Sequence, residues 1–326
     1  MSRPVLLLGP QRVEPTLRAA VDRLGVEGPI ATVTAGWEER EGEDEELAQH
    51  LGGRTRNLGL FPRAESVFEQ DSELFAALSA RYDRQSELRE LYRSRLAHVL
   101  GSARELFERK GDPEMLAPHR AHAVEAVRAL DCFHLQQRDA IQAEFDERWH
   151  IHDRESVAQQ RLELRDILND CGALCIAGGH VGILLSRLRI FGVLDLFPAD
   201  RPIIAWSAGS MVLSERVVLF HDSPPQGAGD AEVWSTGLGI ARGVVPLPHA
   251  GHRLRLDDRA RVALFSRRFA PSTSVALLPK CGIETITDET QTAGAASWRS
   301  LDPATKQLTA SGELVPIGAE REGATC

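Results

Sequence analysis

The sequence lacks the features that mark membrane and secreted proteins. No apolar run approaches the roughly 20 residues that a helix needs to span a bilayer. The apolar start, Met1 to Leu8, is short and is not followed by the small-residue cleavage site of a signal peptide. We therefore expect a cytoplasmic protein with no membrane partner.

Cysteine is scarce and its spacing is uninformative. The chain has five cysteines, an odd number, and no two of them form a Cys-x-x-Cys pair of the kind found in zinc and redox sites. They are Cys132, Cys171, Cys175, Cys281 and Cys326. We expect them to be reduced and structural.

Basic residues are in deficit, and no nucleotide motif is present. Lys and Arg number 38 against 47 Asp and Glu, a formal net charge of -9. Because nucleic-acid binding depends on neutralising phosphates with Lys and Arg, nucleic acid is not expected as the main partner. Gly178 and Gly179 do not form the Gly-x-Gly-x-x-Gly pattern of a dinucleotide site, so no cofactor is expected.

Histidine pairs are present, but they do not complete a metal site. His119 and His122 are one helical turn apart, and His150 and His152 flank a single residue. No cysteine or carboxylate adds a recognisable ligand spacing. We expect no metal.

The remaining pattern is that of an α/β protein. A chain of 326 residues that is 43% hydrophobic has room for one large or two modest domains. Apolar runs at 4–8, 30–34, 57–61 and 173–177 are interpreted as strands, and residues 17–24 and 183–188 have helical spacing. This alternation predicts a mostly parallel sheet with helices on both faces, similar to the sheet of class I glutamine amidotransferases.

A charged, glycine-poor block separates the two halves of this pattern. Two amphipathic stripes, broken at Gly111-Asp112-Pro113, predict a hairpin of two long helices, and residues 154–169 predict a third helix. We therefore assign 1–62 and 171–326 to an α/β core, and 63–170 to an α-helical insertion that serves as an arm or lid. Its apolar stripes, which include Leu91 and Val99, predict a homodimer through the insertion.

Ser207 is the candidate nucleophile. The apolar run Ile203 to Trp206 leads into Ser207-Ala208-Gly209 and then a helix-compatible stretch. A sharp strand-to-helix turn exposes a serine hydroxyl and aims the next backbone N–H at the substrate oxygen. The alternative is an ordinary loop in which Ser207 caps the helix.

A base, an acid and oxyanion donors follow other apolar runs. His249 comes after the run Val244 to Leu247, and Asp222 comes after the run Arg216 to Phe220. The carboxyl ends of parallel strands form a shared crevice, so these residues can converge on Ser207. We expect His249 as base, Asp222 as its orienter, and the N–H groups of Gly179 and Ala208 as the oxyanion hole. Glu284 and Asp258 remain open as alternative acids.

Three segments together resemble the dipeptidase E and cyanophycinase family of serine peptidases: Cys175-Ile-Ala-Gly-Gly-His180, Ala205-Trp-Ser-Ala-Gly209 and Pro248-His249. The resemblance implies a class I glutamine amidotransferase-like fold with Ser207 as nucleophile, His249 as base, and Gly179 with Ala208 as oxyanion donors. It also implies Asp222 as the acid on the dipeptidase E pattern, or Glu284 on the cyanophycinase pattern. The likeness is weak over the first 60 or so residues and extends well over residues 171–290.

The sequence departs from the family pattern in four places. Ala205 replaces the first elbow glycine, His180 replaces an asparagine, and Ala250 replaces a phenylalanine. The long helical block is absent from the small family members. These changes bear more on the substrate than on the class of chemistry.

The expected function is therefore that of a serine peptidase acting on small peptides. A binding or scaffold protein that acts through its helical insertion is the alternative, based on the size and charge of that block. Glutamine amidotransferase chemistry is disfavoured because its nucleophile is a cysteine thiolate, whereas position 207 is a serine.

Overall fold

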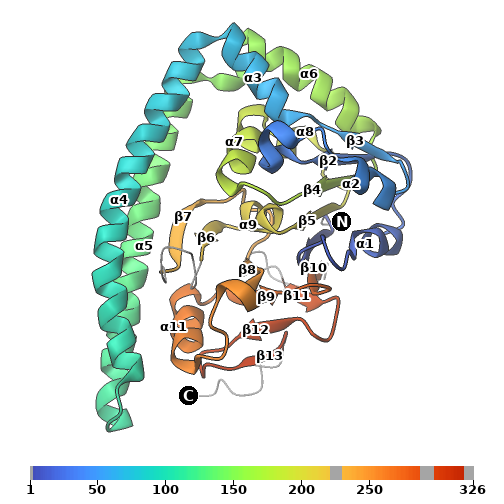
Figure 1. Ribbon diagram of the computed structural model, residues 1–326. Helices are drawn as coiled ribbons and strands as arrows, with labels where there is room; N and C mark the ends of the chain where they lie inside the picture. Colours follow the sequence, from blue (N-terminus) through green and yellow to red (C-terminus); the bar gives the residue numbers. More distant parts are fainter. Residues whose placement is uncertain (1–2, 221–229, 287–296, 319–326) are drawn as a thin grey trace.

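The computed structural model describes residues 3–220, 230–286 and 297–318 and has a seven-stranded sheet at its centre (Figure 1). The strand order is β11-β10-β1-β5-β4-β2-β3. The strands are β1 (Val5–Leu8), β2 (Ile30–Val33), β3 (Thr55–Asn57), β4 (Ala173–Ile176), β5 (Ile203–Trp206), β10 (Gly282–Ile286) and β11 (Ser297–Ser300). Strands β1, β5, β4, β2 and β3 run parallel to one another. Strands β10 and β11 complete one edge of the sheet in antiparallel pairing. The mixed α/β class predicted from the sequence is confirmed.

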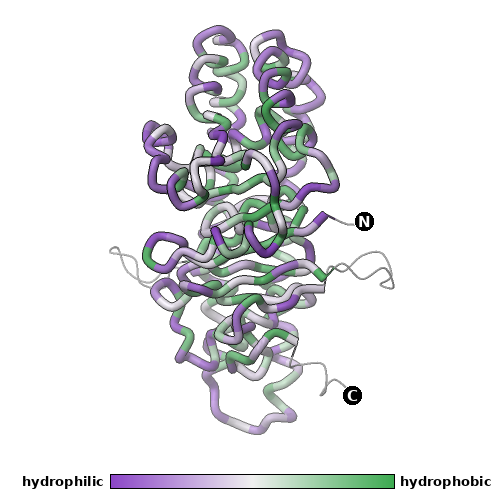
Figure 2. The backbone as a smooth tube through the Cα atoms, turned by 90° about the vertical axis from the view of Figure 1, so that its right-hand side faces the viewer, coloured by the Kyte–Doolittle hydropathy of each residue, from purple (hydrophilic) through white to green (hydrophobic). Residues whose placement is uncertain are grey.

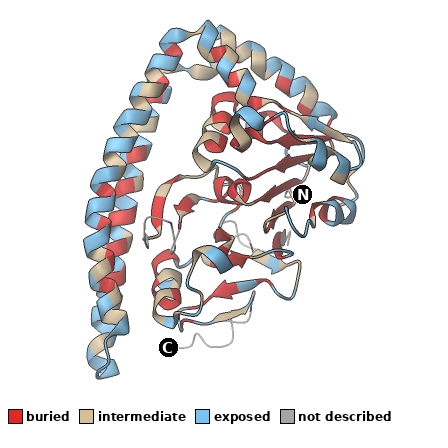
Figure 3. Cartoon of the chain, viewed as in Figure 1, coloured by how far each residue is buried: buried red, intermediate tan, exposed pale blue. Residues whose placement is uncertain are grey.

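Helices cover both faces of this sheet because its parallel strands are apolar on both sides. Strands β1, β2, β4 and β5 are buried at every residue. One face packs against α1 (Leu17–Arg23) and α2 (Glu45–His50). The other packs against α3 (Leu60–Gln70), α6 (Glu155–Asp170), α7 (Val181–Phe191), α8 (Val193–Leu196) and α9 (Ala208–Leu213). The hydrophobic trace in Figure 2 and the buried ribbon in Figure 3 both follow the strands.

A second, smaller sheet lies below the first in Figure 1. Its order is β13-β12-β9-β8, with β8 (Val244–Pro248), β9 (Thr273–Leu277), β12 (Lys306–Leu308) and β13 (Leu314–Pro316). Helix α10 (Ala250–Arg253) follows β8, and α11 (Arg259–Phe269) packs on this sheet. A hairpin of β6 (Arg216–Leu219) and β7 (Glu232–Thr236) stands apart from both sheets.

The third strand predicted at 57–61 is present, but it lies earlier, at β3 (Thr55–Asn57), because the chain turns into α3 at Leu60. Gly59 is left-handed, with φ 59°, and the buried carboxylate of Glu41 accepts the N–H groups of Leu60 and Phe61 at 3.1 and 2.5 Å. A side chain distant in sequence thus caps the helix, so the local pattern could not reveal it. Burial raises the pKa of Glu41 despite these hydrogen bonds.

The predicted helical hairpin is present. Helix α4 (Ser72–Glu108) and helix α5 (Pro113–Trp149) run antiparallel over their whole length, joined near Gly111. We call these two helices the arm. A short turn, η2 (Ile151–Asp153), leads from the arm into α6, which packs on α3 and α8 beside the sheet. The division into 1–62 with 171–326 and 63–170 stays a prediction.

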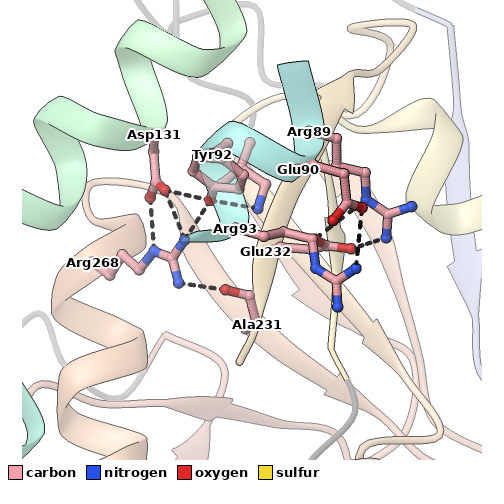
Figure 4. A network of polar contacts seen from close by, with 9 residues as sticks. Arg89, Glu90, Tyr92, Arg93, Asp131, Ala231, Glu232 and Arg268 are labelled. Carbon is pink, nitrogen blue, oxygen red and sulfur yellow. Dashed lines mark hydrogen bonds and ion pairs between the residues drawn. The ribbon is translucent and has the colours of Figure 1, made fainter. Parts of the chain in front are cut away.

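A buried polar network attaches the arm to the core (Figure 4). Arg268 of α11 donates to both carboxylate oxygens of Asp131 on α5, each at 2.7 Å, and its side chain is 2% exposed. The Tyr92 hydroxyl on α4 donates to Asp131 at 2.7 Å and accepts the N–H of Val233 on β7 at 3.1 Å. Arg268 also donates to the Ala231 carbonyl at 2.7 Å. The network therefore joins both arm helices, α11 and the β6–β7 hairpin.

The arm packs partly on its own chain, which bears on the predicted dimer. Leu96 and Leu100 of the first stripe are buried in a cluster with residues of α5 and with Leu264 of α11. Leu91 remains 62% exposed, and Phe133 remains 47% exposed. The homodimer stays a prediction.

In the described ranges, no helix is long and apolar enough to cross a membrane. Cys171, Cys175 and Cys281 are buried free thiols, and burial raises the pKa of Cys175 to about 12. Cys132 is free and exposed.

Replacing Asp131 with Asn should lower the free energy of unfolding by about 3–5 kcal/mol, because it leaves the buried Arg268 charge uncompensated. Urea unfolding measures this change. The control is Arg84→Gln, which removes an exposed ion pair with Glu144 and should change the free energy of unfolding far less, because exposed ion pairs contribute little. A change in Asp131→Asn as small as that of the control would contradict the assigned role of the network.

Candidate active site

Ser207 lies at a strained turn between β5 and α9. Its φ is 52° and its ψ is -124°, a conformation that non-glycine residues rarely adopt and that costs on the order of 1–3 kcal/mol. Strand β5 is fully buried, and α9 begins immediately after Ser207. The side chain itself is only partly buried, so its hydroxyl is presented at the carboxyl end of the sheet.

Glycines provide the space that this turn needs. A Cβ at Gly209 would overlap the carbonyl oxygen of Ile176. A Cβ at Gly178 would lie 2.6 Å from the Ser207 Cβ, closer than real Cβ contacts come. Gly179 has φ 110°, and a Cβ there would overlap the carbonyl of Gly36. The Gly178-Gly179 turn after β4 therefore lies directly against the serine turn.

His249 reaches Ser207 from the second sheet. It follows β8, in a left-handed conformation with φ 59°, and its N–H donates to the Leu277 carbonyl of β9 at 3.2 Å. Its Nε2 lies 3.3 Å from the Ser207 Oγ. The sequence predicted that these two residues converge at the edge of one sheet. The structure brings them together from two different sheets, with α9 packed against β8.

The imidazole of His249 is poised to be neutral. Partial burial lowers its pKa below 6.5, and electrostatic interactions with Arg253 and then His252 lower that pKa further. A neutral Nε2 at this position can accept the hydroxyl proton of Ser207. Arg253 is half-buried on α10, close to His249.

The predicted oxyanion donors flank the serine. Ala208 is the first residue of α9, and Gly179 stands in the turn against which Ser207 packs. Neither N–H donates a backbone hydrogen bond among the described residues, whereas the neighbouring N–H of His180 is bound to the Gly36 carbonyl at 2.6 Å. Unbonded N–H groups at a helix start are suited to stabilise a negative oxygen.

The acid of the site is not identified among the described residues. Asp222 lies outside the described ranges. Glu284 lies on β10, where its buried carboxylate binds Arg23 and Arg299 instead of His249. Asp258 caps α11 by accepting the N–H of Arg261 at 3.1 Å, and it pairs with Arg255. Of the three acids considered from the sequence, only Asp222 is left without a contrary assignment.

The sequence reasoning missed the packing partners of the site. Gly36, in the short 3-10 helix (Ala35–Arg40) after β2, packs against both Gly178 and Gly179. The ring of Trp234 on β7 approaches Gly182 at the start of α7. Gly36 follows a predicted strand, and a glycine at that position was a sequence signal of close packing. Nothing in the local sequence marked Trp234, which comes from the β6–β7 hairpin.

Neither histidine pair belongs to a group of potential metal ligands among the described residues. His119 and His122 lie on α5, and His152 contacts the Arg189 carbonyl at 3.2 Å. In the part of the chain that the structure describes, no group of three or more His, Cys, Asp or Glu side chains could hold a metal ion.

Gly209→Ala should destabilise the protein by at least about 1–3 kcal/mol, because the added methyl group meets the Ile176 carbonyl inside the serine turn. Gly101→Ala is the matched control, since a Cβ at that position in α4 meets nothing within 4 Å and Ala favours a helix. Thermal unfolding of both variants tests this. Equal melting temperatures would contradict the close packing described here.

Comparison with known proteins adds little to this geometry. No protein-family model matches the sequence, and no curated protein matches it. Among solved structures, the crystal structure of a peptidase from an acI-B1 Actinobacterium aligns with 98% of this chain and 96% of its own length. The sequence identity is 13% and the TM-score is 0.48. At these values the likeness supports no statement about the chemistry of this chain.

Proposed function

We propose that this protein is a serine hydrolase that cleaves small peptides, with Ser207 as nucleophile and His249 as base. The observation that carries the proposal is the strained Ser207 turn, with its Oγ 3.3 Å from the His249 Nε2. A serine that merely capped α9 would need neither this backbone strain nor an adjacent imidazole. Ser207 in fact makes no side-chain capping hydrogen bond to α9.

In this mechanism, His249 Nε2 takes the proton from Ser207 as Oγ attacks the peptide carbonyl carbon. The N–H groups of Gly179 and Ala208 stabilise the resulting oxyanion. The protonated imidazole then gives its proton to the leaving amine, and an acyl-enzyme forms. Water, deprotonated by His249, hydrolyses the acyl-enzyme. Asp222 is proposed as the group that orients the imidazole.

Arg253 supports small peptides as the substrate class. It is half-buried beside His249, and no ion pair is formed by it among the described residues. A guanidinium in this position can bind the terminal carboxylate of a short peptide. We propose that residues 1–62 and 171–326 form the catalytic core and that the inserted helices border its cleft.

A fluorophosphonate probe should label the wild-type protein and should not label Ser207→Ala, because the probe reacts only with an activated serine hydroxyl. Mass spectrometry of the labelled peptide gives the measurement. Ser210→Ala is the matched control, since Ser210 lies one turn further along and is bound to the Ala205 carbonyl at 3.0 Å. Undiminished labelling of Ser207→Ala would refute the proposal, as would an unlabelled wild-type protein that hydrolyses no dipeptide.

The labelling rate should rise with pH through a midpoint below 6.5, because only neutral His249 accepts the serine proton and its pKa is lowered. Arg253→Gln should move the midpoint upward, since it removes a positive charge that lowers the pKa of His249. Arg255→Gln should leave it unchanged, because Arg255 pairs with Asp258. A midpoint that Arg253→Gln does not shift would argue against His249 as the base.

A further inference from the structure

A large cavity separates the arm from the core. It has a volume of about 1310 Å³ and is bounded by α4 and α5 on one side and by α7 and the β6–β7 hairpin on the other. In Figure 1 the arm meets the core at β7 and α11 and returns to it through α6, with α7 facing the arm between these points. His180 and Gly182, which follow the oxyanion turn, line the cavity, so it begins beside the proposed active site.

The polar wall of this cavity is rich in arginine. Five arginines line it: Arg81, Arg89, Arg138, Arg187 and Arg189. Two of them are neutralised, because Arg89 pairs with Glu232 and Arg187 pairs with Glu65. The other three form no ion pair with any residue that the structure describes. Buried charges are ordinarily paired, so this group requires an explanation.

Arg138 of α5 is the most enclosed of the three. Its side chain is 6% exposed. It donates to the backbone and side-chain carbonyls of Gln85 at 3.3 and 3.1 Å, and its Nε has no hydrogen-bond partner in the described structure. The guanidinium lies over the Trp234 ring, 5.3 Å from its centroid. These contacts position the charge without neutralising it.

Arg81 and Arg189 complete the group from the arm and the core. Arg81 of α4 donates to Gln142 at 3.1 Å and lies over the Phe145 ring, and its buried Nε is likewise unpartnered. Arg189 of α7 donates to the Thr236 carbonyl at 2.9 Å. All of these partners are neutral. The three arginines thus come from three helices and line the same cavity.

The arginines repel one another. Burial, followed by the charge of Arg189, lowers the pKa of both Arg81 and Arg138 to about 10. All three remain protonated at neutral pH, so the cavity keeps their charge. The carboxylates that line it lie at its edge: Glu65, Asp83, Asp146 and Asp153 are exposed, and Glu38 is half-buried. Burial lowers the pKa of Arg189 more than Asp139 and Asp146 raise it. Asp139 likewise raises the pKa of Arg138, and Asp146 that of Arg81, by less than burial lowers them.

The rest of the wall is apolar. Phe68, Leu78, Leu185, Ile190 and Trp234 line the same cavity. A ligand that fills it must therefore offer oxygens to the guanidiniums and carbon surface to these side chains. Carboxylate and phosphate both match the planar fork of arginine.

We propose that the cavity between the arm and the core binds a small organic anion whose carboxylate or phosphate group is held by Arg81, Arg138 and Arg189. The aromatic and aliphatic side chains contact the apolar body of the ligand. Because one of these arginines belongs to the core and two to the arm, the ligand also joins the two parts. This site is separate from the Ser207–His249 pair and does not depend on the proposed hydrolase activity.

Isothermal titration calorimetry at low ionic strength tests the proposal with three probes: 3-phenylpropanoate, phenyl phosphate and uncharged benzyl alcohol. The two anions should bind and benzyl alcohol should not, and the tighter anion identifies the preferred group. Arg138→Gln and Arg81→Gln should each weaken the anions by roughly tenfold or more, since each loses a charged hydrogen bond. Arg84→Gln should bind like the wild type, because Arg84 pairs with Glu144 and does not line the cavity. Ser207→Ala should also bind like the wild type.

Stability separates a binding role from a structural one. Without a ligand, Arg138→Gln should melt at the wild-type temperature or above it, because it relieves repulsion. The anions should raise the melting temperature of the wild type by more than that of Arg138→Gln. The proposal fails if neither anion binds at millimolar concentration, or if Arg138→Gln and Arg81→Gln bind as tightly as Arg84→Gln. It also fails if Arg138→Gln melts lower and its anion affinity is unchanged.

Discussion

The guanidinium of Arg268 stands where the arm, the second sheet and the β6–β7 hairpin meet. Its charge is removed from water, and Asp131 together with the Tyr92 hydroxyl and the Ala231 carbonyl replaces that water. A buried ion pair gives little net stability compared with apolar packing, but it tolerates few alternative arrangements. The pair therefore fixes where the arm lies, and the cavity above it exists only while the arm holds that position. The position of the arm therefore depends on this polar geometry as well as on the apolar packing of arm residues against Leu264 and the core.

The serine turn depends on a different constraint, which is close packing of backbone on backbone. Strand β5 ends against Gly178, and Gly209 allows α9 to start against the Ile176 carbonyl. The strain at Ser207 is sustained because Gly178 packs closely against it and because the next residues, Ala208 and Gly209, are buried. His249 arrives on a separate sheet, so its distance from Ser207 is fixed by the packing of α9 on β8. The pair therefore depends on the contact between the two sheets.

Much of this architecture could be read from the sequence, since it follows from short-range patterns. Apolar runs marked β1, β2, β4 and β5, and the break at Gly111 marked the hairpin. The serine turn was marked by its small residues. The start of α3 was misread because Glu41 caps it from a distant position, and the sheet that carries His249 could not be inferred because strand partners are a long-range property. The arginines around the cavity are far apart in the chain and look like ordinary solvated charges on helices until the arm is placed. The acid of the site stays a prediction at Asp222.

The helical insertion leaves the sheet after β3 and returns to it at β4. Strand β4 pairs directly with β2, which is the neighbour of β3. The long insertion therefore closes between strands that lie almost side by side. The entropy of closing a loop rises only slowly with its length, and here much of that length is taken up by a hairpin whose helices contact each other locally. A nascent chain can form α4 and α5 while the strands that will flank them are still incomplete. Because the insertion returns the chain beside β2, β4 can pair there without a long unstructured connection.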